Sequence, residues 1–338
     1  MSGPTSSASK RRLLLAGRVL AWLIVLASVV FFARGLRWSS MSAAFAAADL
    51  RLAILALLLG LPCTVFGGLR WFSLVRPISD ASPGTVLAAT YVGAAASVLL
   101  PMRAGEAVRV ELLARATGLP RAVALGTLAI DHTVNGLVMF LFAAVLPLVL
   151  PVPLWLALLV WGGVLAAVAL VLVMLRLGRP LDADAGSGSA RAGILLRLRG
   201  GLVGLRNPRA VIPAAIFSAA AWGLEIVVTM VALAAFHLPH DAAHAMGVLF
   251  GVNLAQAIPA PPANLGNFEL GAAMALVAFG GSNENAAAFA LGFHALQLLP
   301  TLLGGALALP RFSPSRLPAR GFAQERPAEQ SPNPATRS

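Results

Sequence analysis

Six long apolar runs dominate this chain and constrain its fold more than any other feature. A helix needs about 20 apolar residues to cross a bilayer. The runs are Leu13–Ala33, Leu52–Val75, Ala122–Leu146, Val152–Leu175, Ala210–Phe236 and Asn285–Leu309. Only 11% of the residues are charged, against about 25% in soluble domains. The sequence therefore predicts an all-α fold, a polytopic transmembrane helical bundle.

Four shorter apolar pieces come as two pairs, and each pair is interrupted by a polar segment rich in Pro and Gly. The pieces are Thr85–Leu100, Ala107–Thr117, Ala245–Ile258 and Phe268–Gly280. They are short for a span, and broken helices occur at membrane depth where protein or water shields the backbone. We therefore expect re-entrant helical hairpins near residues 84–118 and 245–281. The alternative, in which the arms are tilted full spans, gives eight or more crossings.

Arg and Lys set the expected orientation, because cytoplasmic loops collect them. Lys10, Arg11 and Arg12 place the N-terminal tail, residues 1–12, in the cytoplasm. Residues 176–209 hold seven Arg and form a basic cytoplasmic connector. Residues 311–338 are polar and rich in Pro, which predicts a disordered cytoplasmic tail. Arg34, Arg37 and Arg51 disagree, since they flank a predicted external loop.

Threading the spans through these loops gives two membrane halves of opposite orientation, residues 13–175 and 210–310. Each half has three spans and one hairpin, so the pattern predicts an inverted repeat, an architecture typical of transporters. The bias of 24 Arg to one Lys, with much Ala, Gly and Leu, is typical of a GC-rich bacterial genome. The expected location is thus the bacterial cell inner membrane.

Several partner and cofactor classes have no support in the sequence. The net charge of +12 fits loop topology and anionic lipid head groups, and no basic and aromatic motif indicates nucleic-acid binding. The single cysteine, Cys63, excludes an intramolecular disulfide. His237, His240 and His244 resemble metal-ligand spacing without a strong fourth ligand. We expect no cofactor, no metal and no ATP-driven pump.

The first polar segment, LPMRAGEAVR at Leu100–Arg109, places charge where lipid is expected. Ionisable groups at membrane depth are costly and mark function by default. Glu106 can pair with Arg109 on one helix face, and Arg103 in the turn stays free to bind an anion. Arg103 and Arg109 are therefore the candidate ligands for a phosphate or similar group, with Glu106 as a residue that orients them. The alternative is a cytoplasmic surface loop with solvated charges.

The second polar segment, PAPPANLGNFE at Pro259–Glu269, contributes Asn264 and Glu269 to the candidate site. Glu269 opens an apolar helix, where a Glu also serves as a simple cap.

Three further polar residues lie inside the apolar spans. Asp131 shares a helix face with Asn135 and needs a partner there, either an Arg of the first segment or a proton. Asp131, Glu225 and His294 are candidates for a proton relay. Buried ion pairs and helix-packing hydrogen bonds are the structural alternatives for all three.

These motifs resemble those of the lysylphosphatidylglycerol synthase/flippase transmembrane-domain family. An LPxRxGExxR-like motif is matched by Leu100, Pro101, Arg103, Gly105, Glu106 and Arg109. In a second motif, Gly266 and Glu269 match, whereas Ala263 and Asn264 replace its glycine-rich part. The resemblance covers about residues 15–310.

The resemblance implies translocation of a polar-headed lipid between leaflets rather than synthesis of lysyl-lipid, because no soluble synthase domain follows Leu309. Its candidate cargoes are phospholipids, aminoacyl-lipids, hopanoids, as in the hopanoid-associated branch, and isoprenoid-linked lipids. The expected partners are membrane lipids and separately encoded lipid-biosynthesis enzymes. The alternatives are an integral-membrane transferase, with Glu106 or Asp131 as general base, or an accessory scaffold.

Overall fold

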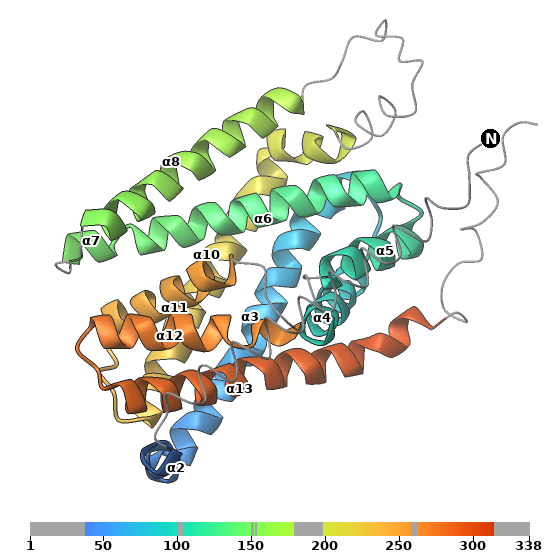
Figure 1. Ribbon diagram of the computed structural model, residues 1–338. Helices are drawn as coiled ribbons and strands as arrows, with labels where there is room; N and C mark the ends of the chain where they lie inside the picture. The colour runs from blue at the N-terminus through green and yellow to red at the C-terminus, as the bar shows by residue number, and fades with distance from the viewer. Residues whose placement is uncertain are drawn as a thin grey trace, which may run out of the picture.

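The computed structural model describes residues 38–100, 104–149, 152, 154–178, 199–257 and 262–313, which form helices and short connections without a strand (Figure 1). Five helices are long and apolar enough to cross a membrane. They are α3 (Leu50–Val75), α6 (Arg121–Ala143), α8 (Leu154–Leu177), α10 (Pro208–Ala235) and α13 (Asn283–Ala308). Five of the six predicted spans are thus confirmed. The sixth, Leu13–Ala33, lies outside the described residues, as do the N-terminal tail and residues 314–338 of the C-terminal tail.

Side-chain caps explain where these helices begin. A carboxylate, hydroxyl or amide oxygen before the first turn accepts a backbone N–H that has no partner inside the helix. The cap residues are Asp49 for α3, Ser82 for α4, Asn207 for α10, Asp241 for α11 and Ser282 for α13. Several of the predicted spans therefore begin two residues later than the helices themselves.

The shorter apolar pieces form two pairs of packed helices. The first pair is α4 (Pro83–Leu99) with α5 (Gly105–Thr117), and the second is α11 (Ala242–Gln256) with α12 (Asn267–Ala278). Both pairs meet at glycines: Gly93 contacts Gly105 in the first, and Gly251 contacts Gly271 in the second. Small residues let helix backbones approach closely. The re-entrant depth of the pairs and their inverted relation stay predictions.

The same order of elements occurs twice along the chain. A long helix, a helix pair and a second long helix follow one another in α3–α6 and again in α10–α13. The first long helices of the two sets, α3 and α10, pack together along their length at the centre of the molecule (Figure 1). The interface between the two sets is therefore the centre of the fold.

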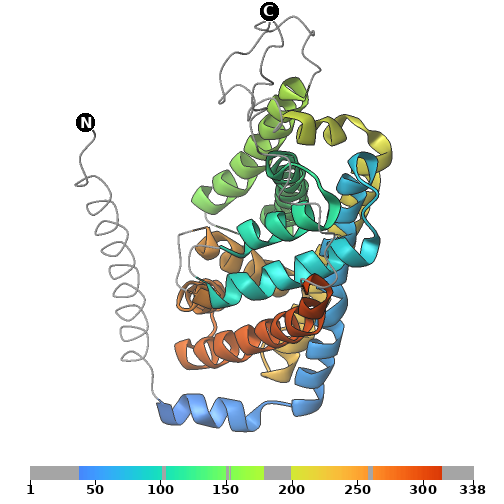
Figure 2. The ribbon, with the colours of Figure 1, turned by 90° about the vertical axis from the view of Figure 1, so that its right-hand side faces the viewer.

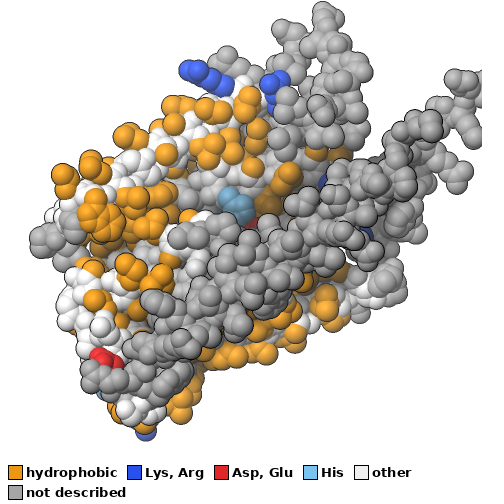
Figure 3. Space-filling view, in the orientation of Figure 1, with side chains coloured by type: hydrophobic (Ala, Val, Ile, Leu, Met, Phe, Trp, Pro, Cys, Tyr) orange, Lys and Arg blue, Asp and Glu red, His pale blue; other side chains and the backbone are white. Residues whose placement is uncertain are grey.

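Helix α8 lies at the periphery and packs chiefly against α6 (Figure 1). Its large apolar side chains are largely exposed, as with Leu154, Trp155 and Leu165. Apolar side chains also cover much of the described surface in Figure 3. An exposed surface of this kind is expected of helices that face lipid.

Helix α2 (Trp38–Ala47) was not predicted and lies within the segment interpreted as an external loop. It runs across the end of α3 (Figure 2). Phe45 packs edge-on against Phe236 at 5.6 Å between ring centroids, and the Asp49 N–H donates to the Ala235 carbonyl over 2.8 Å. These contacts attach the α2–α3 corner to the end of α10.

The corner between α5 and α6 is held by a charge cluster that gives a pH-dependent prediction. Glu111 accepts from Arg115 over 2.6 Å and from Arg121 over 2.5 Å. These hydrogen bonds lower the pKa of Glu111 from 4.5 to about 2. A group with a lowered folded pKa stabilises the protein above its unfolded pKa and loses that contribution as the pH falls.

Glu111→Gln is therefore expected to lower the free energy of unfolding at pH 7 by less than about 1 kcal/mol, which lowers the melting temperature slightly. The difference in melting temperature between the variant and the unmodified protein should narrow as the pH falls from 4.5 towards 2. Thermal melts in detergent across this pH range measure it. A gap that widens on acidification would contradict the assignment.

Candidate functional site

The charged centre of the first half joins three helices. Asp131 of α6 is fully buried and accepts from the Arg70 Nε of α3 over 2.8 Å. It also pairs with the Arg109 Nη2 of α5 over 3.3 Å. The predicted partner, an Arg of the first polar segment, is confirmed in Arg109. Arg70 was missed as a second partner, so one buried carboxylate here pairs with two buried guanidinium groups.

Arg109 is also fixed by an aromatic ring and by the acid of its own helix. Its guanidinium lies over the Trp71 ring at 4.1 Å from the centroid, an attractive cation–π contact. Glu106 lies 3.8 Å from the Arg109 Nη1, which confirms the predicted pairing, and 3.3 Å from the His132 Nε2. Arg103 lies outside the described residues.

Asn135 connects this centre to the second half. Its side-chain oxygen accepts from the Arg70 Nη1 over 2.6 Å, which confirms that Asp131 and Asn135 share a face. The same oxygen accepts from the Trp222 Nε1 over 3.1 Å and from the Ser218 hydroxyl over 3.3 Å, both on α10. A single amide thus joins α3, α6 and α10.

The second half has a buried acid–histidine pair at the corresponding helices. Glu269 of α12 lies 2.7 Å from the His294 Nδ1 of α13, and both side chains are about 5% exposed or less. Its other oxygen accepts the Gly266 N–H over 2.8 Å, so the cap interpretation of Glu269 is confirmed. Asn264, at φ +55°, donates to Gln256 over 3.5 Å.

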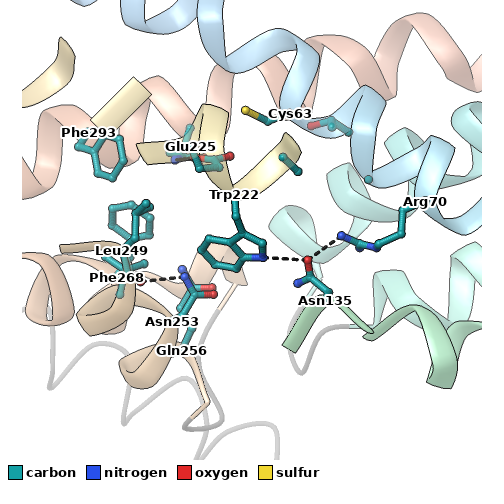
Figure 4. A pocket seen from close by; sticks show the side chains of 15 residues that line it. Cys63, Arg70, Asn135, Trp222, Glu225, Leu249, Asn253, Gln256, Phe268 and Phe293 are labelled. Carbon is teal, nitrogen blue, oxygen red and sulfur yellow. Dashed lines mark hydrogen bonds between the residues drawn. The ribbon is translucent and has the colours of Figure 1, made fainter. Parts of the chain in front are cut away.

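A polar cavity of about 310 Å³ lies between the two halves (Figure 4). Most of its polar wall is neutral, and among the described residues that line it only Arg70 and Glu225 have ordinarily charged side chains. Figure 4 shows these two on different sides of Trp222. The other lining residues are Cys63, Thr64, Gly67, Asn135, Ala221, Trp222, Leu249, Val252, Asn253, Gln256, Phe268, Phe293 and Gln297.

The cavity includes only part of the predicted site. Asn135 and Glu225 line it, whereas Asp131, Arg109, Glu269 and His294 are buried in pairs beside it, and Glu106 and Asn264 do not line it. Sequence reasoning missed Arg70, Trp222, Gln256 and Gln297 as lining residues. Arg70 did leave a signal, because an arginine inside an apolar run is costly unless it has a partner.

The histidine-rich loop has a structural explanation. Asp241 caps α11 by accepting the backbone N–H groups of Ala243 and His244, and its other oxygen lies 2.7 Å from the His244 Nδ1. The hydrogen bond from the His244 backbone is the largest favourable cause that lowers the pKa of Asp241. In the part of the chain that the structure describes, no three His, Cys, Asp or Glu residues group as metal ligands do.

Apolar spans, helix pairs joined at glycines and a polar cavity between two halves define a polytopic helical membrane protein with an internal site. A family model described as the lysylphosphatidylglycerol synthase TM region matches residues 18–305, and the chain belongs to this family. The family points to a membrane protein in a lipid-related function. No curated protein and no solved structure matches the chain.

Proposed function

We propose that this protein moves a lipid with an anionic polar head group between the leaflets of the bacterial inner membrane, without ATP. The head group occupies the cavity of about 310 Å³, and its acyl chains stay in the bilayer. Both chain termini are cytoplasmic, and separately encoded biosynthetic enzymes supply the lipid. The observation that carries the proposal is a polar cavity, with an arginine in its wall, among helices suited to lipid.

Arg70 is the residue that binds the anion in this proposal. It lines the cavity, and its guanidinium has a planar fork that suits a phosphate. Asp131 and Asn135 hold it through three hydrogen bonds of 2.6 to 3.2 Å. Arg109 contacts the same carboxylate and helps to hold Asp131 in place, so it is a positioning residue. This moves the binding role from the predicted Arg109 to Arg70, two helices away.

The direct test replaces a glycine in the cavity wall with a larger residue. A Cβ added at Gly67, which lines the cavity, meets no atom within 4 Å, so Gly67→Val is expected to fold while its methyl groups occupy head-group space. Gly162→Val, at an exposed glycine of α8 that is equally open, is the matched control. Arg70→Gln removes the charge in a second experiment, with Arg115→Gln as the control for loss of a surface arginine.

Transfer of NBD-labelled phosphatidylglycerol in proteoliposomes, read by dithionite quenching without ATP and at equal pH on both sides, measures the function. Arg70→Gln should slow transfer by about tenfold or more, since hydrogen bonds to charged groups contribute about 1.5–3 kcal/mol. Gly67→Val should slow transfer to a similar extent because its methyl groups occupy head-group space. Both controls should match the unmodified protein. The proposal fails if proteoliposomes exchange the lipid no faster than empty liposomes. It also fails if the two cavity variants behave like the controls.

A further inference from the structure

Glu225 is the second charged group of the cavity, and its surroundings differ from those of Asp131. The Gln297 Nε2 donates to the Glu225 carboxylate over 3.0 Å, and the Cys63 thiol lies beside it. Both partners are uncharged in their ordinary forms. Asp131 has two arginines, whereas Glu225 has no cation in contact among the described residues.

The helices around Glu225 present few other titratable or charged groups to it. From α3 these are Cys63 and Arg70, and Arg70 is already bonded to Asp131 and Asn135. The α6, α11, α12 and α13 residues that share the cavity with Glu225 are uncharged: Asn135, Leu249, Val252, Asn253, Gln256, Phe268, Phe293 and Gln297. An ionised carboxylate taken out of water without a cation is costly. A carboxyl in such surroundings avoids that cost when it holds a proton.

A second, smaller cavity is also lined by Glu225. It measures about 20 Å³ and shares Thr64, Glu225 and Gln297 with the larger cavity. A water molecule needs about 10–15 Å³ of such space and two to four polar partners. Thr301 lines the small cavity, as does Leu296, whose carbonyl receives no N–H from Pro300 one turn later. The small cavity therefore has both the size and the polar groups to hold a water molecule.

We infer that Glu225 is a proton-binding site that exchanges its proton through the small cavity and couples head-group movement to a proton gradient. The inference rests on the proposed function and adds its energy source. The proton passes from a hydronium ion to the Glu225 carboxylate, leaving water and a neutral carboxylic acid, and later returns to water on the other side. No electrons are transferred.

The shared cavity sets the direction of coupling. An anionic head group at Arg70 repels an ionised Glu225 in the same low-dielectric space, so it favours the protonated carboxyl. Because linkage between two binding sites is reciprocal, the bound proton favours the anionic head group by the same factor. Lipid and proton therefore move together in the same direction. Of the three predicted relay residues, only Glu225 lines a cavity, since Asp131 and His294 are held in buried pairs.

Two variants separate proton coupling from lipid binding. Glu225→Gln keeps the shape and hydrogen bonding of the protonated carboxyl but cannot exchange a proton. Gly60→Val fills only the small cavity, because Gly60 lines it and a Cβ there meets no atom within 4 Å. Gly67→Val, one heptad along α3, fills only the large one. Glu284→Gln, in the first turn of α13 and outside both cavities, is the control for loss of an acid.

Transfer of anionic NBD-phosphatidylglycerol and lumenal pyranine fluorescence are measured in the same proteoliposomes. In the unmodified protein and Glu284→Gln, an acidic exterior should speed inward transfer by about fivefold or more, the lower end of common coupling strengths. Inward transfer should also acidify the lumen. Gly60→Val should keep transfer at equal pH yet lose both responses. Glu225→Gln should lose both responses, whatever its rate of transfer at equal pH. Retention of either response by Glu225→Gln would overturn the inference.

Infrared difference spectroscopy of the purified protein provides a readout that does not need transport. A protonated carboxyl band should disappear as the pH is raised, persist in Gly67→Val and be missing in Glu225→Gln. If the proteoliposomes exchange no lipid but this band is present, the proposed function is wrong and the assignment of Glu225 as a proton site still holds. If lipid exchange does not respond to the pH difference across the membrane, or if Glu225→Gln keeps the titrating band, the assignment of Glu225 as a proton site is wrong. The proposed function still holds in both cases.

Discussion

Asp131→Asn is expected to lower the free energy of unfolding by about 3–5 kcal/mol, the usual cost of removing one partner from a buried ion pair. The amide keeps the shape of the carboxylate but not its charge. Arg70 and Arg109, whose side chains are 9% and 7% exposed, would then face each other without an anion between them. Denaturant unfolding in detergent, followed by fluorescence of the tryptophans, measures the loss.

A second substitution tests whether buried charge is the cause. Adding Arg109→Met to Asp131→Asn removes one of the two guanidinium groups that lose this carboxylate, and it keeps an apolar side chain against Trp71. The double variant should therefore be more stable than Asp131→Asn alone. Glu111→Gln, which breaks a surface cluster, should lose less than about 1 kcal/mol. A loss of that small size in Asp131→Asn would show that the buried cluster does not stabilise the fold.

The glycine contacts of the two helix pairs give the second large effect. Gly105→Ala and Gly271→Ala are each expected to cost about 1–3 kcal/mol, as overpacking does in a filled interior. A Cβ at Gly105 meets the Gly93 carbonyl oxygen, and one at Gly271 comes within 2.5 Å of the Gly251 carbonyl oxygen. Backbone atoms of a packed helix cannot rotate away as a side chain would.

Gly136→Ala on α6 is the matched control, because a Cβ there meets no atom within 4 Å. It should be neutral or stabilise by up to about 1 kcal/mol, since Ala is the better helix former. The measurement is the midpoint of thermal unfolding in the same detergent for all three variants. Equal unfolding midpoints for all three variants would mean that the close glycine contacts do not hold the helix pairs together.

Much of the fold was predictable because it depends on local properties of the chain. Hydrophobic length predicted α3, α6, α8, α10 and α13 to within a few residues. The polar segments at Leu100–Arg109 and Pro259–Glu269 predicted where each helix pair turns. Helix α2 escaped prediction because its ten residues neither span a bilayer nor show a strong polar face, and it is held by Phe236 and Ala235 from far along the chain.

The candidate site was predictable only in part, for a different reason. Charge alone gave two alternatives for Asp131, an arginine of the first polar segment or a proton, and the structure identifies the arginine as Arg109. Nothing local predicted that Arg70 would share that carboxylate, because Arg70 and Asp131 are 61 positions apart in the chain. The contact of Trp222 with Asn135 spans 87 positions.

By itself, the sequence determined which segments are helices suited to a membrane and which residues are too polar to be left there unpartnered. Both follow from the cost of bringing charge and backbone polarity into hydrocarbon, which a short window of residues already reveals. Only the tertiary structure decided which charges neutralise one another and which face the cavity. That choice depends on how α3 and α10 pack, which places Arg70 with two hydrogen-bonded neighbours and Glu225 with neutral ones.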